Sequence, residues 1–183
     1  TKITKRDMMY AKEMGMTIKL LASSKRHKDH LHAIVAPALL GKDHPLYNID
    51  DVFNAVFVHG NMLGDAMFYG SGAGKLPTAS AVVADVVDEA KHLHRNIMTM
   101  WKSEKLVLEP IEDTCKRFFV RVSGNAEEMK EKVEKLFGAV QIVKVPALED
   151  EFSFVTEVMT EGDYRKKAEE LPEILHMIRI EER

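Results

Sequence analysis

Apolar residues near the start of the chain recur at helical spacing. Between Asp7 and Met14 they predict one short helix, and Thr4 stands where an N-terminal cap would stand. Gly15 follows the last of these residues, and glycine readily adopts the positive φ that ends a helix. The pattern therefore predicts a capped helix that ends before residue 15.

Two apolar runs follow this helix and are typical of strands. The first covers residues 17–22 and the second covers residues 31–40, with a break expected at Pro37. The polar segment Ser23–His30 separates them and is expected to form the turn of a hairpin. Its basic cluster, Lys25–Lys28, is interpreted as a solvated loop tip rather than an anion site.

Three further elements are predicted before residue 97. Val52–His59 and Met62–Tyr69 are apolar segments joined by a glycine-containing turn, which indicates a pair of strands. A helix is expected from Pro77 to about Asn96, with small residues on one face for close packing against a sheet. Residues 97–114 lack a clear period and are interpreted as a linker.

A different pattern begins at residue 115. Its predicted elements are a strand from Lys116, a helix over Ala126–Phe137, strands over Val140–Val145 and Phe152–Met159, a helix over Glu161–Leu171 and a strand over Ile174–Ile180. This βαββαβ order is that of a ferredoxin-like domain. The predicted fold class is α+β: a partial mixed α/β domain over 1–96, the linker, and a ferredoxin-like domain over 115–183.

The segment before the long helix is rich in glycine. Gly70, Gly72 and Gly74 allow a sharp turn and close approach of the backbone to another group. Pro77 suits the first helical turn, where Thr78 or Ser80 is expected to satisfy free amide donors. A glycine loop at a helix N-terminus suits a phosphate, a carboxylate or a polar cofactor edge. The spacing matches neither nucleotide-binding glycine motif, so a simple strand-to-helix connection is the alternative.

Charge and composition exclude several classes of function. Lysine and arginine number 26 against 29 acidic residues, so a net charge of −3 gives no overall attraction for nucleic acid. Cys115 is the only cysteine, and no apolar run approaches the roughly 20 residues of a membrane span, so a cytoplasmic protein is expected. His27, His30 and His32 lack an evident fourth ligand or supporting shell, so no metal site is predicted.

Several motifs resemble the homoserine dehydrogenase family. They are Asp7–Leu21, His44-Pro45-Leu46, Val52–Val56 and the glycine loop with its helix, Gly70–Asp85, in the family's order and roughly its spacing. The resemblance implies the C-terminal part of the catalytic region of an oxidoreductase that uses NAD or NADP. That enzyme interconverts aspartate semialdehyde and homoserine in threonine and methionine biosynthesis. It also implies that Gly74, together with Gly72, lies against the nicotinamide end of the cofactor.

The family's other catalytic parts are not found in this sequence. Its N-terminal Rossmann domain, which binds most of the cofactor, and the Asp-x-x-x-Lys helix that supplies the catalytic lysine would both precede Thr1. No catalytic residue is therefore assigned in the chain. The chain is expected to begin inside a longer protein and to be inactive alone.

The C-terminal domain resembles an ACT domain, a small regulatory module of amino-acid metabolism. The resemblance places effector binding at the turn after the first strand, here Ser123, Gly124, Asn125 and Ala126, although the usual Pro-Gly pair is missing. It implies a homo-oligomer, a dimer or tetramer, with threonine as the possible effector. A non-enzymatic ACT-type amino-acid sensor with a dimerisation scaffold is the alternative function.

Overall fold

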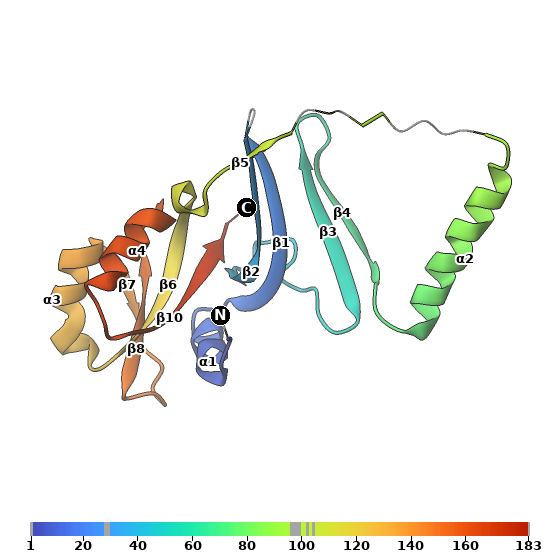
Figure 1. Ribbon diagram of the computed structural model, residues 1–183. Coiled ribbons are helices and arrows are strands. Elements are labelled where there is room, and N and C mark those ends of the chain that lie inside the picture. Colours follow the sequence, from blue (N-terminus) through green and yellow to red (C-terminus); the bar gives the residue numbers. More distant parts are fainter. Residues whose placement is uncertain (1, 28–29, 96–99, 102, 104, 183) are drawn as a thin grey trace. The chain divides into compact units, whose positions relative to one another are not determined.

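The computed structural model describes residues 2–27, 30–95, 100–101, 103 and 105–182 (Figure 1). These residues divide into two compact units. The first unit consists of Thr1–His44 and Leu106–Arg183, and the second consists of Pro45–Lys105. The first unit is therefore built from both ends of the chain. The domain boundaries expected from the sequence, after residue 96 and before residue 115, stay a prediction.

Helix α1 (Lys5–Glu13) is fixed at both ends by the residues that the sequence indicated. The backbone N–H of Asp7 donates to the Thr4 hydroxyl, and the backbone N–H of Thr4 donates to the Asp7 carboxylate at 2.7 Å. This reciprocal pair is a capping box. Beyond the helix, Gly15 has a φ of 66°, which confirms the predicted end.

The predicted hairpin is longer than the sequence indicated. Strands β1 (Thr17–His27) and β2 (His30–Leu40) pair antiparallel along their whole length, so Ser23–Arg26 lie in a strand and not in the turn. Polar residues are tolerated there because β1 is the edge strand of the sheet and its side chains reach water.

The predicted break at Pro37 is also wrong. Pro37 pairs opposite Leu20 inside β2, while pairing of β2 with the neighbouring strand β10 (Ile174–Glu181) begins only at Ala38. Proline therefore occupies a position at which one side of β2 is still unpaired, and such edge positions accommodate a missing N–H.

The C-terminal part has the predicted βαββαβ order. Its elements are β6 (Cys115–Ser123), α3 (Ala126–Phe137), β7 (Val140–Val143), β8 (Glu151–Thr156), α4 (Glu161–Glu169) and β10. The four strands form an antiparallel sheet in the order β10-β6-β8-β7, and β2 adds to β10 in parallel over Ala38–Leu40. The hairpin thus extends this four-stranded sheet into one larger mixed sheet, which is consistent with the predicted α+β class.

Some predicted boundaries differ from those observed. The third predicted strand ends at Thr156, and Met159–Thr160 form a separate short strand, β9, against the start of β6. In the predicted linker, Val107–Leu108 form strand β5 against β2, and Ile111–Asp113 form a 3-10 turn, η1. Residues 97–99, 102 and 104 of that linker lie outside the described residues.

The C-terminal sheet is covered on both faces, so β6 is buried on both sides. Phe118, Val120 and Val122 face α3 and α4, the two helices that lie together in Figure 1. Phe119, on the opposite face, packs with Tyr10 of α1, and their ring centroids are 5.8 Å apart. Consecutive side chains of a strand point to opposite faces. Arg121 therefore lies on the same face as Phe119, beneath α1.

The second unit consists of a hairpin and a helix. Strands β3 (Phe53–Gly60) and β4 (Gly64–Ser71) pair antiparallel as predicted, and helix α2 spans Lys75–Lys91. The helix begins two residues before Pro77, and it ends at Lys91 with His92 as its C-cap, so the predicted end near Asn96 is wrong.

The small-residue face of α2 does not pack against a sheet in this unit. No residue of α2 is buried, and its exposed valines include Val82, Val83 and Val86. The prediction of close packing is therefore wrong for this unit. The helix carries its own apolar side chains on most of its sides. This composition is typical of a helix that other elements enclose.

We expect the backbone amides of α2 to exchange with solvent within seconds in a dilute solution of the 183-residue chain. Most helical stability in proteins comes from packing of one face, and no residue of α2 is buried, whereas buried strands open only through large-scale unfolding. Hydrogen exchange followed by NMR would show α2 amides exchanging at least about 1000-fold faster than those of β6. Equal protection of α2 and β6 would show that the apolar surface of α2 is covered.

Candidate functional site

Gly74 has a backbone conformation that other residues rarely adopt. It is the N-cap residue of α2, with φ of 111° and ψ of 154°. The Thr78 backbone N–H and hydroxyl both donate to the Gly74 carbonyl, at 3.2 Å and 2.9 Å. The expectation that Thr78 or Ser80 satisfies first-turn amides is wrong, because no side chain caps this helix. The Thr78 hydroxyl is positioned to reach back one turn and donate to a carbonyl instead.

The other glycines of the loop have different local environments. A Cβ atom at Gly72 would collide with the side chain of Asn54 on β3, whereas Gly70 faces open space. Most of this loop is exposed, and amide donors of the first turn of α2 lack a side-chain acceptor. Such a loop can bind a polar or anionic edge through its backbone. The same geometry would also be found in a loop that only connects β4 to α2 and binds no ligand.

The predicted effector turn lies between β6 and α3. Asn125 is the N-cap of α3, and its side chain accepts a hydrogen bond from the Glu127 amide at 2.8 Å. Gly124, with φ of 108°, donates its amide to the Asp150 carbonyl at 3.0 Å. Ser123 is held separately, since its amide and hydroxyl donate to the Glu173 carbonyl. The turn is thus fixed by the segments before β8 and before β10.

A cavity of 420 Å³ lies beside this turn. Its wall is formed by the turn, the start of α3 and the segment from β7 to β8: Gly124, Asn125, Ala126, Glu127, Lys144, Val145, Pro146, Leu148, Glu149, Glu151 and Phe152. Three of the four predicted effector residues line this cavity, and Ser123 does not. Lys144 forms an ion pair with Glu127 across the wall. The cavity therefore offers both a cation and several carboxylates to a small polar ligand.

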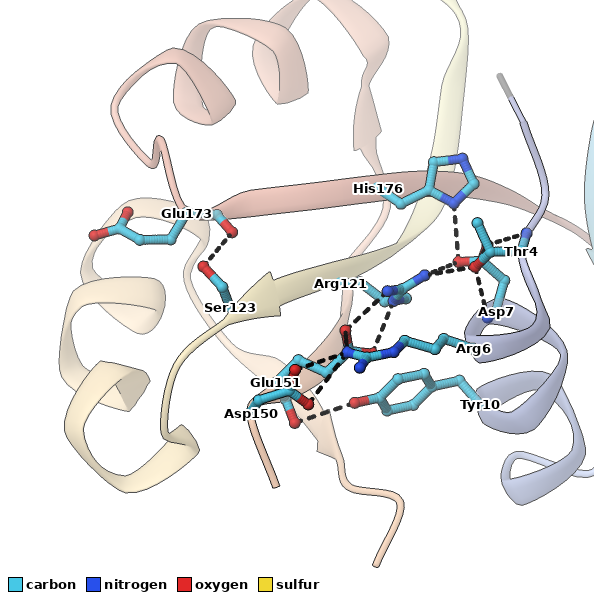
Figure 2. Close-up of polar contacts among 10 residues, drawn as sticks. All are labelled: Thr4, Arg6, Asp7, Tyr10, Arg121, Ser123, Asp150, Glu151, Glu173 and His176. Atoms are coloured by element: carbon cyan, nitrogen blue, oxygen red, sulfur yellow. Dashed lines mark hydrogen bonds and ion pairs between the residues drawn. The ribbon is translucent and has the colours of Figure 1, made fainter. Parts of the chain in front are cut away.

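Sequence reasoning missed the buried charges between this cavity and α1. Arg121 donates to both carboxylate oxygens of Glu151, at 3.1 Å and 2.8 Å, and to Asp7 at 2.8 Å (Figure 2). Asp7 also accepts from His176 Nδ1 at 2.9 Å. Arg6 reaches the same end of β8, with Glu151 at 2.7 Å and Asp150 at 2.9 Å. These contacts join α1 to the wall of the cavity.

The acidity of Asp7 follows from these contacts. Burial of its carboxyl acts to raise the pKa, but hydrogen bonds from His176, Arg121 and Thr4 outweigh burial and lower the pKa to about 2. For Arg121, burial acts to lower the pKa, and hydrogen bonds to Glu151 and Asp7 raise it above the ordinary value. The pair is thus held in its charged form.

One signal in the sequence could have indicated this cluster. Arg121 interrupts an apolar strand that is buried on both faces, and a buried charge requires a partner of opposite sign. The sequence does not identify that partner, because Asp7 lies 114 positions away. Among the described residues, no group of histidine, cysteine and acidic side chains could hold a metal ion, and the His27 side chain lies outside them.

Known proteins resemble this chain over nearly its whole length. The protein family described as homoserine dehydrogenase matches residues 1–87. The homoserine dehydrogenase of Synechocystis is 34% identical over 92% of the chain, and that of Helicobacter pylori is 36% identical over 69% of it. The solved homoserine dehydrogenase of Thiobacillus denitrificans superposes on 98% of the chain with a TM-score of 0.79 and 28% identity.

The chain belongs to the homoserine dehydrogenase family. It spans 43% of the Synechocystis protein, 30% of the Helicobacter pylori protein and 46% of the solved Thiobacillus denitrificans chain. The family resemblance inferred from the glycine loop and the N-terminal motifs is therefore confirmed. Homoserine dehydrogenases are oxidoreductases, and this chain corresponds to part of one.

The match to homoserine dehydrogenase includes the glycine loop and most of α2, because it extends to residue 87. The assignments of Gly72 and Gly74 to the cofactor, and of Ser123–Ala126 to an effector, stay predictions. In the part of the chain that the structure describes, no helix is long and apolar enough to cross a membrane.

We expect Asp7 to make the stability of this homoserine dehydrogenase chain depend on pH below 4. Its folded pKa of about 2 lies below the ordinary 3.8, so its stabilising contribution is present above pH 4 and is lost as pH falls toward 2. A shift of this size corresponds to about 2 kcal/mol. Urea unfolding of Asp7→Asn should therefore show a deficit near that value at pH 6 that shrinks toward pH 2.

The control for this experiment is Asp85→Asn, which removes an exposed carboxylate from α2. It should change the unfolding free energy by less than about 0.5 kcal/mol at either pH. A deficit for Asp7→Asn that is equally large at pH 6 and pH 2 would contradict the assignment, since it would reflect packing rather than charge.

Proposed function

We propose that the chain is the C-terminal portion of a homoserine dehydrogenase. The complete enzyme would interconvert aspartate 4-semialdehyde and homoserine, with NADPH or NADH reducing the aldehyde to the alcohol as a proton is taken up. The observation that carries this proposal is the family match over residues 1–87, which contains the glycine loop and α2. When bound, the nicotinamide cofactor supplies the hydride for the reduction.

The residues of this chain fit a supporting contact with the cofactor. Gly74 presents bare backbone at the start of α2, and amide donors of the first turn remain without side-chain acceptors. Backbone N–H groups at a helix start can bind a polar or anionic edge. The described residues include no glycine loop of the dinucleotide-binding type, so most of the cofactor's binding surface is assigned to the rest of the enzyme.

The catalytic groups are likewise assigned outside this chain. Reduction of an aldehyde requires a donor near the carbonyl oxygen and a proton for the forming hydroxyl. The carboxyl groups with lowered pKa among the described residues are held in ion pairs that stabilise the fold. Asp7 and Glu161 pair with arginine, and Glu127, Glu173 and Glu181 pair with lysine. We therefore propose that the 183-residue chain is inactive alone.

A regulatory role is proposed for the βαββαβ part, as an ACT-like domain. The 420 Å³ cavity beside Asn125 has the size and mixed charge that suit a small zwitterion such as threonine. The ligand carboxylate would lie near the start of α3 and Lys144, and its ammonium near Glu149 or Glu151. The alternative is a non-enzymatic amino-acid sensor. The likeness of 98% of the chain to a solved homoserine dehydrogenase supports the enzyme.

The first test of the enzymatic proposal replaces Gly74 by valine in the full-length enzyme. A β-branched residue is strained at a φ of 111°, and it would fill the space next to the proposed cofactor contact. We expect the cofactor KM to rise at least about tenfold or kcat to fall by a similar factor. The 183-residue chain, assayed in parallel, should show no homoserine oxidation with NAD or NADP.

The matched control is Gly70→Ala, because a Cβ atom at Gly70 meets nothing within 4 Å. Its kinetics and melting temperature should stay unchanged. If Gly74→Val has ordinary kinetics, the loop does not contact the cofactor. If it only lowers the melting temperature, its role is structural.

The second test addresses the regulatory domain. We expect the chain to form a dimer or larger homo-oligomer in sedimentation experiments at micromolar concentration, because its sheet has free edges at β1 and β7. Threonine should bind and shift the distribution of species. A monomer at high micromolar concentration would refute the association, and an oligomer that does not respond to threonine would refute only the regulation.

A further inference from the structure

Two consecutive acidic residues, Asp150 and Glu151, connect the cavity beside Asn125 to helix α1. Glu151 lines the cavity and accepts hydrogen bonds from Arg121 and Arg6. Asp150, the residue before it, receives the Gly124 amide on its backbone carbonyl and the Arg6 guanidinium on its side chain. A displacement of the segment that precedes β8 therefore affects both the turn and α1.

Two separate series of contacts, called routes here, connect Asp150 and Glu151 to α1. The exposed route runs from Gly124 through Asp150 to Arg6, which is the second residue of α1. The buried route runs from Glu151 through Arg121 to Asp7, whose carboxylate also closes the capping box with Thr4 (Figure 2). Both routes end within the first turn of the helix.

The buried route has little freedom to rearrange. Glu151 is 4% exposed, Arg121 is 6% exposed and Asp7 is fully buried. Two nitrogens of the Arg121 guanidinium each bind a different carboxylate oxygen of Glu151. This bidentate pairing fixes the orientation of the guanidinium. Networks of hydrogen bonds and salt bridges can carry coupling between sites, and the contacts from Glu151 through Arg121 to Asp7 form such a network without a gap.

We propose that Arg6 and Arg121 couple the cavity beside Asn125 to helix α1, so that a ligand in the cavity tightens the hold on α1. Arg121 is a positioning residue in this scheme, because it fixes Glu151 and Asp7 relative to each other and does not itself line the cavity. A ligand that orders Glu149–Glu151 and the Gly124 turn fixes the acceptors of both arginines. By linkage, if the ligand stabilises the start of α1, then stabilising the start of α1 must favour ligand binding by the same free energy.

This inference rests on the proposed function only for the identity of the ligand. Its first test needs no ligand, since the Gly124 amide reports on the cavity wall directly. Arg6→Gln in the full 183-residue chain removes the contacts of α1 with Asp150 and Glu151. We expect hydrogen exchange of the Gly124 amide, measured by NMR, to rise about tenfold while the urea midpoint changes little.

Arg165→Gln is a matched control for this measurement. Arg165 on α4 also bridges one buried and one exposed carboxylate, those of Glu161 and Glu112. Its side chain is 48% exposed and that of Arg6 is 43% exposed. The substitution should leave Gly124 exchange unchanged. An unchanged Gly124 rate in Arg6→Gln, or an equal rise in both variants, would overturn the coupling.

The second test uses L-threonine as the probe. At saturating threonine, amides of the first two turns of α1 should exchange at least about fivefold more slowly. In Arg6→Gln, which removes one of the two routes, this protection should be reduced while protection at Asn125–Glu128 persists. Arg121→Lys keeps the charge without the forked geometry and should weaken the effect. Because a lysine also places a cation between Asp7 and Glu151, this variant is expected to stay folded.

The outcomes separate the coupling from the proposed function. If threonine protects α1 equally in the unchanged chain and in Arg6→Gln, the coupling is overturned although the effector is correct. If calorimetry detects no threonine binding but Arg6→Gln still accelerates Gly124 exchange, the effector assignment fails and the coupling is supported by the ligand-free measurement.

Discussion

The buried guanidinium of Arg121 constrains how α1 and the C-terminal sheet are joined. It lies on the face of β6 that packs under α1, where water does not compensate its charge. Asp7 and Glu151 supply the compensation from two different elements, and removal of either would leave a buried charge without its partner. The packing of α1 on the sheet therefore depends on ion pairs at fixed positions as well as on apolar contacts. Tyr10 and Phe119 supply the apolar contact, and Arg121 fixes its register.

Much of the local structure could be predicted from the sequence. Thr4 and Asp7 are three residues apart in a capping box, and Gly15 marks the end of the helix, so neighbouring residues carry that information. The βαββαβ order likewise follows from the spacing of apolar residues in each element. These features depend on contacts within a few positions of one another or on patterns internal to one element.

Other features depend on residues that are distant in sequence. Ser23–Arg26 read as a turn because they are polar, and only their pairing with β2 at the edge of the sheet makes them a strand. Pro37 is tolerated because β10 joins β2 one residue later. For the candidate sites, the turn at Gly124 could be located from the sequence, but its link to α1 could not. The apolar surface of α2 suggested a packed helix, and the elements that would enclose it are not in its own unit.

The two ends of the chain build one unit, and this order has a consequence for folding during synthesis. Strand β2 pairs with β10 through Ala38–Arg179 and Leu39–Ile180, whereas residues 45–105 form the other unit. When the hairpin leaves the ribosome, the strand that will cover this edge has not yet been translated. Contacts so distant in sequence form late and slowly. A nascent chain would thus expose Leu39 and Leu40, both fully buried in the finished fold, until β10 emerges. Chaperone binding and premature strand pairing would compete during that interval.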